Sequence, residues 1–214
     1  MGIQTIINSA QSIEIDRRKI VGQTISRSER LRIAERASAN AFTIRVSPVA
    51  RFKYSETRGL LESIQFYDRY QEQIIGFASN PKLNYINRYQ GSCTAGQLAA
   101  MTITNFSSST VTVGSLPSIG SSNYVFKAGD WIQPETSRYP YIVVTDVLRG
   151  STTTVQVNVH RPLITSENIT VTGPLLVGTQ TTLRMVVTEL PTYKIIQNNW
   201  AEFTGDFNLI ERII

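Results

Sequence analysis

The chain has 214 residues, of which 41% are hydrophobic and 17% charged, and its net charge at pH 7 is +5. It is long enough to bury a core and too apolar for an intrinsically disordered chain, and it has no run of roughly 18 apolar residues that could cross a bilayer as a helix. The single cysteine, Cys93, excludes an internal disulfide and a multi-cysteine zinc site, and the single histidine, His160, excludes most histidine-based metal sites.

The excess positive charge is confined to the N-terminal third. Residues 1–70 contain twelve basic and seven acidic side chains, whereas residues 71–214 contain nine of each. Arginine outnumbers lysine sixteen to five, and a guanidinium group makes forked, geometry-specific contacts with carboxylate or phosphate. The distribution predicts a surface of fixed polar contacts, and it does not distinguish phosphate from protein carboxylate.

Branched side chains dominate the composition. Isoleucine, valine and threonine together account for 63 of the 214 residues. These side chains are stiff at their first torsion and fit a pleated surface. Serine-rich clusters between the apolar runs are typical of turns. The composition therefore predicts a mainly β protein, a sandwich or barrel of short strands.

The N-terminal region is predicted to contain an apolar arm followed by strands. Residues 1–8 form the arm. Apolar and charged residues then alternate in Ile13–Asp16, Leu31–Arg36 and Phe42–Val46, which is the two-residue period of a strand. We expect two or three strands within residues 12–48, with an exposed face rich in arginine.

One helix is predicted at about residues 56–70. Ser55 is a good N-cap, and Glu56 suits the positive end of a helix. The apolar residues that follow recur at helical spacing, at Leu60, Leu61, Ile64 and Tyr67. Strands are expected next at residues 73–77 and 83–89.

Residues 100–164 are predicted to form a small β-barrel inserted in the larger domain. A hairpin is expected around Ser107–Ser109, where serines separate two alternating runs. Further strands are expected at 168–172, 181–188, 192–196 and 201–210. The rest of the chain, residues 1–99 and 165–214, is expected to form one β domain with one packed helix.

No catalytic centre is predicted. Asp146 is the carboxylate that could face His160 across neighbouring strands, but no Gly-x-Ser-x-Gly nucleophile elbow is present. We interpret His160 as a residue that caps a strand and hydrogen-bonds locally, and Cys93 as a small packed residue. Phosphate-binding glycine loops and paired carboxylates across a cleft are also missing. We therefore expect no enzymatic activity, no cofactor, no metal ion and no small-molecule substrate.

Tyrosines and arginines are mixed near the middle of the chain. The tyrosines are Tyr67, Tyr70, Tyr85 and Tyr89, and the arginines beside them are Arg69 and Arg88. Such mixtures stack on nucleobases, but both residue types are also enriched in protein interfaces. With no RNA-recognition or helix-turn-helix signature in the sequence, the interface is the preferred interpretation.

Four short runs give the chain a recognisable order of segments. They are Phe126–Gln133, with a glycine-aspartate-aromatic turn, the tyrosine-rich Tyr139–Tyr141, then Val147–Gly150, and Val159–Pro162, which ends in Arg-Pro. Together with the arginine-rich strands between Ile13 and Val46 and the helix Thr57–Tyr70, this order resembles tail and baseplate structural proteins of contractile-tailed, cyanophage-like bacteriophages. The tail-tube, distal-tail and hub types are the most similar, and the likeness spans nearly the whole chain.

The resemblance implies a tail-tube-like β-sandwich or barrel that assembles into a symmetric ring, expected to be sixfold. It implies a structural part of the virion, assembled in the host cytoplasm, as baseplate hub, tube initiator or wedge. Its partners would be copies of itself and other tail proteins, with no membrane and with DNA contacted only indirectly. The basic face would then meet acidic partner subunits.

Two groups of residues are expected to serve these roles. Strand edges and arginine contacts make the subunit interface, for which the candidates are Ile3, Ile6, Ile7, Arg17, Arg18, Arg30, Arg32 and Arg45. The turn and packing of the inserted barrel are assigned to Phe126, Gly129, Asp130, Trp131 and Tyr141. The alternatives are a collar or neck protein of the same virion, a nucleic-acid-binding module, and a tail-borne peptidoglycan hydrolase.

Overall fold

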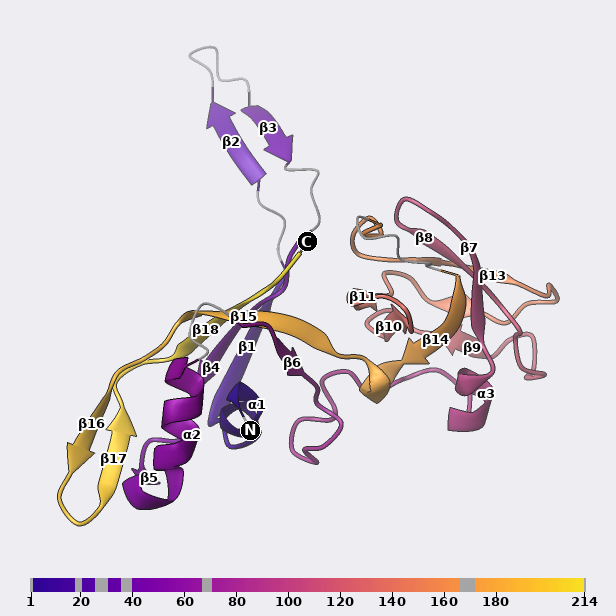
Figure 1. Ribbon diagram of the computed structural model, residues 1–214. Coiled ribbons are helices and arrows are strands. Elements are labelled where there is room, and N and C mark those ends of the chain that lie inside the picture. The colour runs from indigo at the N-terminus through magenta and orange to yellow at the C-terminus, as the bar shows by residue number, and fades with distance from the viewer. Residues whose placement is uncertain are drawn as a thin grey trace. The chain divides into compact units, whose positions relative to one another are not determined.

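The computed structural model describes residues 2–17, 21–25, 31–35, 40–66, 71–165 and 172–213, with the backbone alone for 21–25 and 31–35. These residues form a mainly β protein with 38% strand and 15% helix (Figure 1), and the described strand pairings are antiparallel. The described α-helices are α1 (Ile3–Asn8), α2 (Tyr54–Phe66) and α3 (Ala95–Ala99). The predicted fold class, mainly β with a packed helix, is confirmed.

The chain divides into two compact units that alternate along the sequence. Unit 1 comprises Met1–Asn8, Glu72–Met185 and Ile214, and unit 2 comprises Ser9–Gln71 and Val186–Ile213. The chain therefore leaves unit 1 after Asn8, returns to it after residue 71, and passes again to unit 2 within strand β15 (Leu183–Glu189). The predicted insertion, residues 100–164, lies inside unit 1, which extends further in both directions, from Glu72 to Met185.

Unit 2 is organised around a central strand. Its strands are β1 (Ser12–Asp16), β2 (Val21–Ile25), β3 (Leu31–Glu35), β4 (Thr43–Ser47), β5 (Phe52–Lys53), β16 (Tyr193–Ile196), β17 (Trp200–Phe203) and β18 (Phe207–Glu211). Strand β4 pairs with β1 on one side and with β18 on the other, and β15 follows β18. Separate from this sheet, β2 pairs with β3, and β16, β17 and β5 form a three-stranded sheet in that order.

The core of unit 2 follows from alternation along these strands. Ile44 and Val46 of β4 are buried together with Phe207 and Leu209 of β18, whereas the residues between them face solvent. A second apolar cluster joins helix α2 to the three-stranded sheet, through Leu61, Phe52 and Ala201, with Tyr54, Tyr193 and Phe203 packed against it. Helix α2 is thus the amphipathic element that covers this small sheet.

Unit 1 contains a curled sheet, one of whose strands lies beyond the predicted insertion 100–164. Its strands are β6 (Gln73–Ile75), β7 (Thr102–Ser107), β8 (Thr110–Gly114), β9 (Tyr124–Phe126), β10 (Trp131–Pro134), β11 (Tyr141–Ile142), β12 (Val147–Leu148), β13 (Val155–Asn158) and β14 (Gly173–Val177). Six of them form one sheet in the order β11-β10-β14-β7-β8-β13. A bridge between Val143 and Val159 connects the ends of the two outer strands, so the sheet curls back on itself.

A tight loop in unit 1 packs against the hydroxyl of Tyr89. The Tyr89 hydroxyl donates to the carbonyl of Val125 and accepts from the backbone N–H of Cys93. Burial raises the pKa of Tyr89, so its hydroxyl stays protonated and can donate. Gly91 lies against this hydroxyl, where an added Cβ would overlap Oη and lie 2.7 Å from the Val125 carbonyl oxygen. Glycine is required here for close approach and not for a positive φ.

Four local predictions differ from the structure. The segment predicted as an apolar arm is helix α1, held by Gln4, whose side chain donates to the Gly76 carbonyl and accepts from the Gly76 N–H. Residues 83–89, predicted as a strand, form turns, in which the N–H of Ile86 donates to the Leu83 carbonyl. Residues 201–210 hold parts of two strands, separated by a turn at Thr204–Asp206. Helix α2 begins at Tyr54, and its predicted end, 67–70, lies outside the described residues.

Two glycine substitutions test the loop over Tyr89. Gly91→Ala is expected to lower the free energy of unfolding by about 1–3 kcal/mol, since the methyl group must displace the tyrosine or the backbone. Gly96→Ala, in helix α3 with nothing within 4 Å of the added Cβ, is expected to raise it by about 0.5–1 kcal/mol, because alanine is the better helix former. Urea unfolding of both variants measures the difference, and equal effects at the two positions would contradict this role of Gly91.

Candidate interaction surface

The outward face of the sheet in unit 2 carries charged and polar side chains in register. Glu14 of β1 lies directly opposite Arg45 of β4, which in turn lies opposite Asn208 of β18. In the next row that faces outward, Asp16 and Ile210 lie on either side of Thr43. Because facing residues on adjacent strands are about 5 Å apart, these side chains form one continuous surface.

A groove of about 330 Å³ runs over this face. We call it the sheet groove, and its lining residues are Glu14, Asp16, Thr43, Ile44, Arg45, Thr188, Asn208, Leu209 and Ile210. They come from β1, β4, β15 and β18, so that the groove crosses four strands. The lining combines apolar residues, among them the exposed Ile210, with carboxylate, hydroxyl, amide and guanidinium groups.

Arg45 is held by an acidic group of its own chain. Its Nε lies 2.6 Å from Oδ2 of Asp206, in the turn before β18. A hydrogen bond from the side chain of Ser47, and then the contact with Arg45, hold the pKa of the Asp206 carboxyl below its ordinary value, although partial burial opposes this. Arg45 is thus one half of an ion pair where it lines the groove, beside the carboxylates of Glu14 and Asp16.

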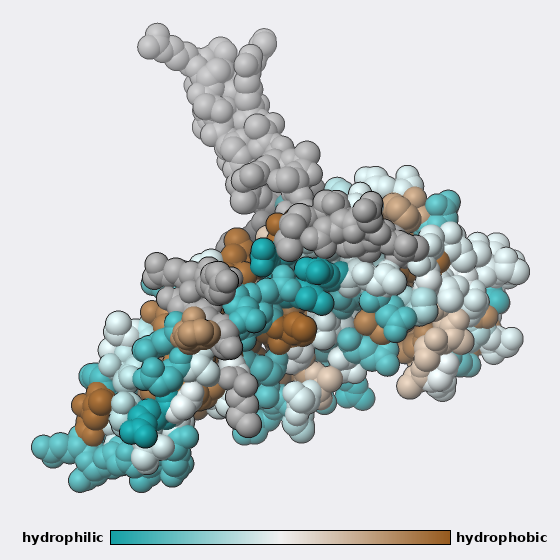
Figure 2. All heavy atoms as spheres, in the orientation of Figure 1, coloured by the Kyte–Doolittle hydropathy of each residue, from teal (hydrophilic) through white to brown (hydrophobic). Residues whose placement is uncertain are grey.

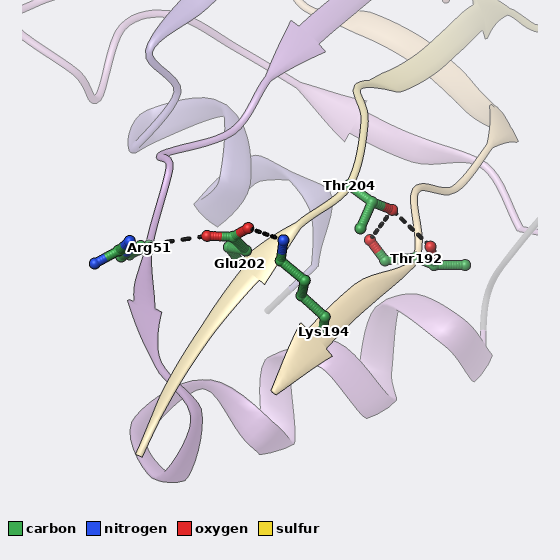
Figure 3. A network of polar contacts seen from close by, with 5 residues as sticks. All are labelled: Arg51, Thr192, Lys194, Glu202 and Thr204. Carbon is green, nitrogen blue, oxygen red and sulfur yellow. Dashed lines mark hydrogen bonds and ion pairs between the residues drawn. The ribbon is translucent and has the colours of Figure 1, made fainter. Parts of the chain in front are cut away.

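The second exposed feature is the hairpin formed by β16 and β17. Glu202 on β17 lies between two cations, with Oε1 2.5 Å from Nζ of Lys194 and Oε2 3.7 Å from Nε of Arg51 (Figure 3). The hydrogen bond from Lys194, opposed by slight desolvation, lowers the pKa of Glu202, so it remains ionised at neutral pH. The hydroxyl of Thr204 bonds the hydroxyl and carbonyl of Thr192 at the open end of the hairpin.

Large apolar side chains lie near the tip of this hairpin. Ile195 is 62% exposed and Trp200 is 37% exposed. The ammonium group of Lys53 lies over the Trp200 ring, 4.6 Å from its centroid, in a cation–π contact. Figure 2 shows hydrophobic spheres among hydrophilic ones over this hairpin. We call β16 and β17, with Arg51 and Lys53, the basic hairpin.

Asn199 ties the tip of the basic hairpin to helix α2. Its carbonyl accepts the N–H of Tyr54, and its side chain accepts the N–H of Ser55 and donates to the Ser55 hydroxyl. The first N–H groups of a helix have no hydrogen-bond partner inside the helix. The bonds from Asn199 satisfy two of them in α2. Asn199 has a φ of 65°, and asparagine tolerates this left-handed region better than most residues do.

The predicted interface residues differ in burial, and some of them lie outside the described residues. Ile3, Ile6 and Ile7, predicted as interface residues of an apolar arm, are buried within unit 1 on helix α1. Arg17 is exposed after β1, and Arg45 is exposed but bound to Asp206. Arg18 and Arg30 lie outside the described residues, and Arg32 lies on β3, where only the backbone is described.

Four of the five residues assigned to the barrel turn and its packing are buried in unit 1, and the fifth, Gly129, is exposed. The side chains of Phe126, Trp131 and Tyr141 are buried, and Gly129 has a φ of 97°. The buried carboxylate of Asp130 accepts the N–H of Lys127 through Oδ2 and the N–H of Gln90 through Oδ1, both at 2.8 Å. Burial raises the pKa of Asp130 although these hydrogen bonds oppose the shift.

The structure gives His160 and Cys93 local roles. Nδ1 of His160 accepts the N–H of Ile142, and the His160 N–H donates to the Ile142 carbonyl, both at 3.0 Å. Asp146, the residue considered as its partner, accepts the N–H of Ala128 instead. Burial raises the pKa of the Cys93 thiol, which lowers the fraction of reactive thiolate.

The basic hairpin was not predicted from the sequence. Residues 192–196 were predicted as a strand, but Lys53, Ile195, Asn199 and Trp200 were not singled out. The asparagine pair Asn198–Asn199, with φ values of 63° and 65°, was the available signal, because such pairs favour hairpin turns. The contacts with β5 and α2 come from residues almost 150 positions away, which no local pattern reveals.

The comparisons with known proteins add no assignment. No protein-family model matches the chain, and no curated protein matches it. Within the described ranges, no group of three or more histidine, cysteine, aspartate or glutamate side chains is arranged to hold a metal ion. No helix among the described residues is long and apolar enough to span a membrane.

The Arg45–Asp206 contact predicts a small dependence of stability on pH. Because the folded-state pKa of Asp206 is lowered, its contribution is present above its ordinary pKa of 3.8 and is lost as the pH falls through the folded value. Asp206→Asn should therefore lower the free energy of unfolding at pH about 6 by up to roughly 1 kcal/mol, and by less at pH about 3. Urea unfolding at both pH values tests this, and a difference independent of pH would contradict it.

Substitutions at Asn198 and Asn199 test the hydrogen bonds between the basic hairpin and α2. Asn199→Gly keeps the positive φ and removes the side-chain bonds, so we expect a loss of about 0.5–2 kcal/mol in the free energy of unfolding. Asn199→Ala should cost about 1 kcal/mol more because alanine is strained at that φ. Asn198→Gly is the matched control and should be neutral or stabilising. Thermal unfolding followed by circular dichroism ranks the three variants, and equal losses at both asparagines would contradict the capping role.

Proposed function

We propose that the protein is a structural component of a bacteriophage tail or baseplate, without enzymatic activity, that assembles into a symmetric ring with copies of itself and with other tail proteins. The order of sequence segments that resembles tail-tube, distal-tail and hub proteins supports this proposal. So does the mainly β fold, which is of the class that the resemblance implies. The site of action is the virion, reached by assembly in the host cytoplasm.

The observation that carries the proposal is the presence of open strand edges in unit 2. In the described part of the chain, β1 is the outermost strand of its sheet, and β16 is the outermost strand of the three-stranded sheet. An outer strand presents unpaired N–H and C=O groups that another chain can extend. Both edges carry charged residues, Glu14 and Asp16 on β1 and Lys194 on β16, which disfavour indiscriminate pairing and favour a partner of complementary charge.

A collar or neck protein of the same virion is the nearest alternative, and it would use the same edges. Gold labelling of the protein in intact particles, seen by electron microscopy, separates the positions. A nucleic-acid-binding module is the second alternative. Its affinity for duplex DNA would fall steeply with salt, because counterion release dominates such binding.

The central expectation is assembly. The purified chain, alone and mixed with neighbouring tail proteins of the same phage, should form complexes of defined stoichiometry in native mass measurement. Since rings close through repeated identical contacts, the masses should be integer multiples of one protomer or of one heteromeric unit. The proposal would be overturned if the chain stays monomeric, binds no tail protein and is missing from labelled particles.

A further inference from the structure

We infer that copies of this chain join by strand pairing, with the open edge of β16 in one copy paired antiparallel to the open edge of β1 in the next. The inference rests on the proposed function, which it deepens by naming the two edges and their register. Both strands belong to unit 2. Among the described residues each is the outermost strand of its own sheet (Figure 1), so neither edge is occupied by the other within one copy.

The hydrogen-bond pattern shows which backbone groups line the edge of β1. Successive residues of an antiparallel strand bond alternately to its two neighbours. Strand β4 bonds β18 through its even-numbered residues, since in the same register the N–H of Glu211 donates to the carbonyl of Phe42, one residue before β4. Its odd-numbered residues therefore bond the even-numbered residues of β1. The N–H and C=O groups of Ile13 and Ile15 are left at the open edge.

The edge of β16 has the same form. The N–H of Thr204 donates to the carbonyl of Thr192, in register with the pairing of β16 and β17. Even-numbered residues of β16 therefore bond β17, and the N–H and C=O groups of Tyr193 and Ile195 point away from it. Each open edge thus presents two bonding residues with one residue between them.

One antiparallel register pairs all of these groups. The facing residues in this register are Ile13 and Ile195, Glu14 and Lys194, and Ile15 and Tyr193. The first and the last pair exchange four backbone hydrogen bonds between the two copies. On one face, aliphatic and aromatic side chains then meet across the strands, which is a stabilising combination. The side chain of Ile195, which is 62% exposed, gains a neighbour there.

On the other face, the central pair extends a row of charged residues from one copy into the next. Within one copy, Lys194 contacts Glu202 on β17, and Glu14 lies opposite Arg45 on β4. Pairing of the edges puts Glu14 opposite Lys194, so that acidic and basic side chains alternate across four strands. Opposite charges at facing positions stabilise a strand pair. The inference does not require Lys194 or Arg45 to lose its ion pair within its own copy.

The same two residues disfavour the symmetric alternatives. Pairing of β16 with β16 through both bonding residues would put Lys194 opposite Lys194, and the corresponding pairing of β1 with β1 would put Glu14 opposite Glu14. Like charges directly opposite each other destabilise a strand pair. The remaining combination uses two different edges, which makes the contact heterologous. Repetition of a heterologous contact generates a ring when the rotation closes.

One such contact is small. Three residues of each strand take part, over a length of about 10 Å, and a contact of this length buries far less than the roughly 1,200–2,000 Å² found in stable interfaces. Two free copies should therefore bind weakly, with a dissociation constant in the micromolar range or above. Closure of a ring would stabilise the contact by making the last pairing intramolecular.

Sedimentation velocity of the full chain over about 10–500 μM tests the contact. Wild type should self-associate. Lys194→Glu and Glu14→Lys should each weaken the association roughly tenfold, because each places like charges opposite each other between copies. Lys82→Glu and Glu135→Lys make the same charge changes at exposed positions of unit 1. They are the matched controls and should leave the association unchanged.

The double variant, with Lys194→Glu and Glu14→Lys in one chain, tests the register. It restores opposite charges between copies, while each change places like charges together within a copy, beside Glu202 and Arg45. We therefore expect association close to that of wild type, with a lower melting temperature in thermal unfolding. An equimolar mixture of the two single variants should also associate. The register is wrong if both single variants are weakened and neither the double variant nor the mixture recovers.

A proline variant tests the backbone bonds without a change of charge, and it replaces any charge variant that fails to fold. The N–H of Ile195 points to the open edge, so Ile195→Pro removes a bond between copies and none within one. Proline is found on edge strands at such positions. Association should weaken roughly tenfold or more. Lys194→Pro, which removes an N–H that bonds β17, is the contrasting control and should lower the melting temperature more than Ile195→Pro does.

The remaining outcomes distinguish the inference from the proposed function. Wild-type association that neither the charge variants nor Ile195→Pro weakens would overturn the pairing of these edges and leave ring assembly through other surfaces in place. A wild-type chain that does not self-associate would also overturn it, and labelled particles would then decide the proposed function. If such a chain binds a neighbouring tail protein and Ile195→Pro weakens that binding, the edge of β16 belongs to another protein and not to a second copy.

Discussion

The register of strand β4 between β1 and β18 is the constraint on which the rest of unit 2 depends. Side chains alternate between the faces of a strand, so a slip of one residue would send Ile44 and Val46 to solvent and Arg45 into the core. The correct register places Arg45 between Glu14 and Asn208 on the outward face. Burial of the apolar residues therefore determines, without further contacts, which polar residues line the sheet groove.

The basic hairpin depends on the same sheet through continuity of the chain. Strands β15 and β18 belong to the main sheet, and β16 and β17 lie between them in sequence. Helix α2 and strand β5 then fix the hairpin from the other side, through Asn199 at the tip and through Phe52 opposite Ala201. An isolated hairpin is only marginally stable in water. The basic hairpin is held at its base by the main sheet and at its tip by α2 and β5.

The sequence predicted those features that depend on local chemistry. Branched residues predicted a mainly β fold, and the helical spacing of Leu61 and Ile64 predicted the helix that buries them. Helix α1 was missed because six residues are too few for a clear period, and its stability comes from tertiary contacts such as Gln4 with Gly76. Glu14, Arg45 and Asn208 meet only through pairings between distant segments, so no single-sequence pattern could bring the groove together.

The net charge of the chain is a poor guide to what unit 2 presents to a partner. The surplus of basic residues before position 70 suggests one positive surface, yet Arg45 and Arg51 each lie beside an acidic side chain of the same unit. Arg45 is held by Asp206, and Arg51 shares the carboxylate of Glu202 with Lys194. The arrangement of these charges in space therefore bears more directly on assembly than their sum.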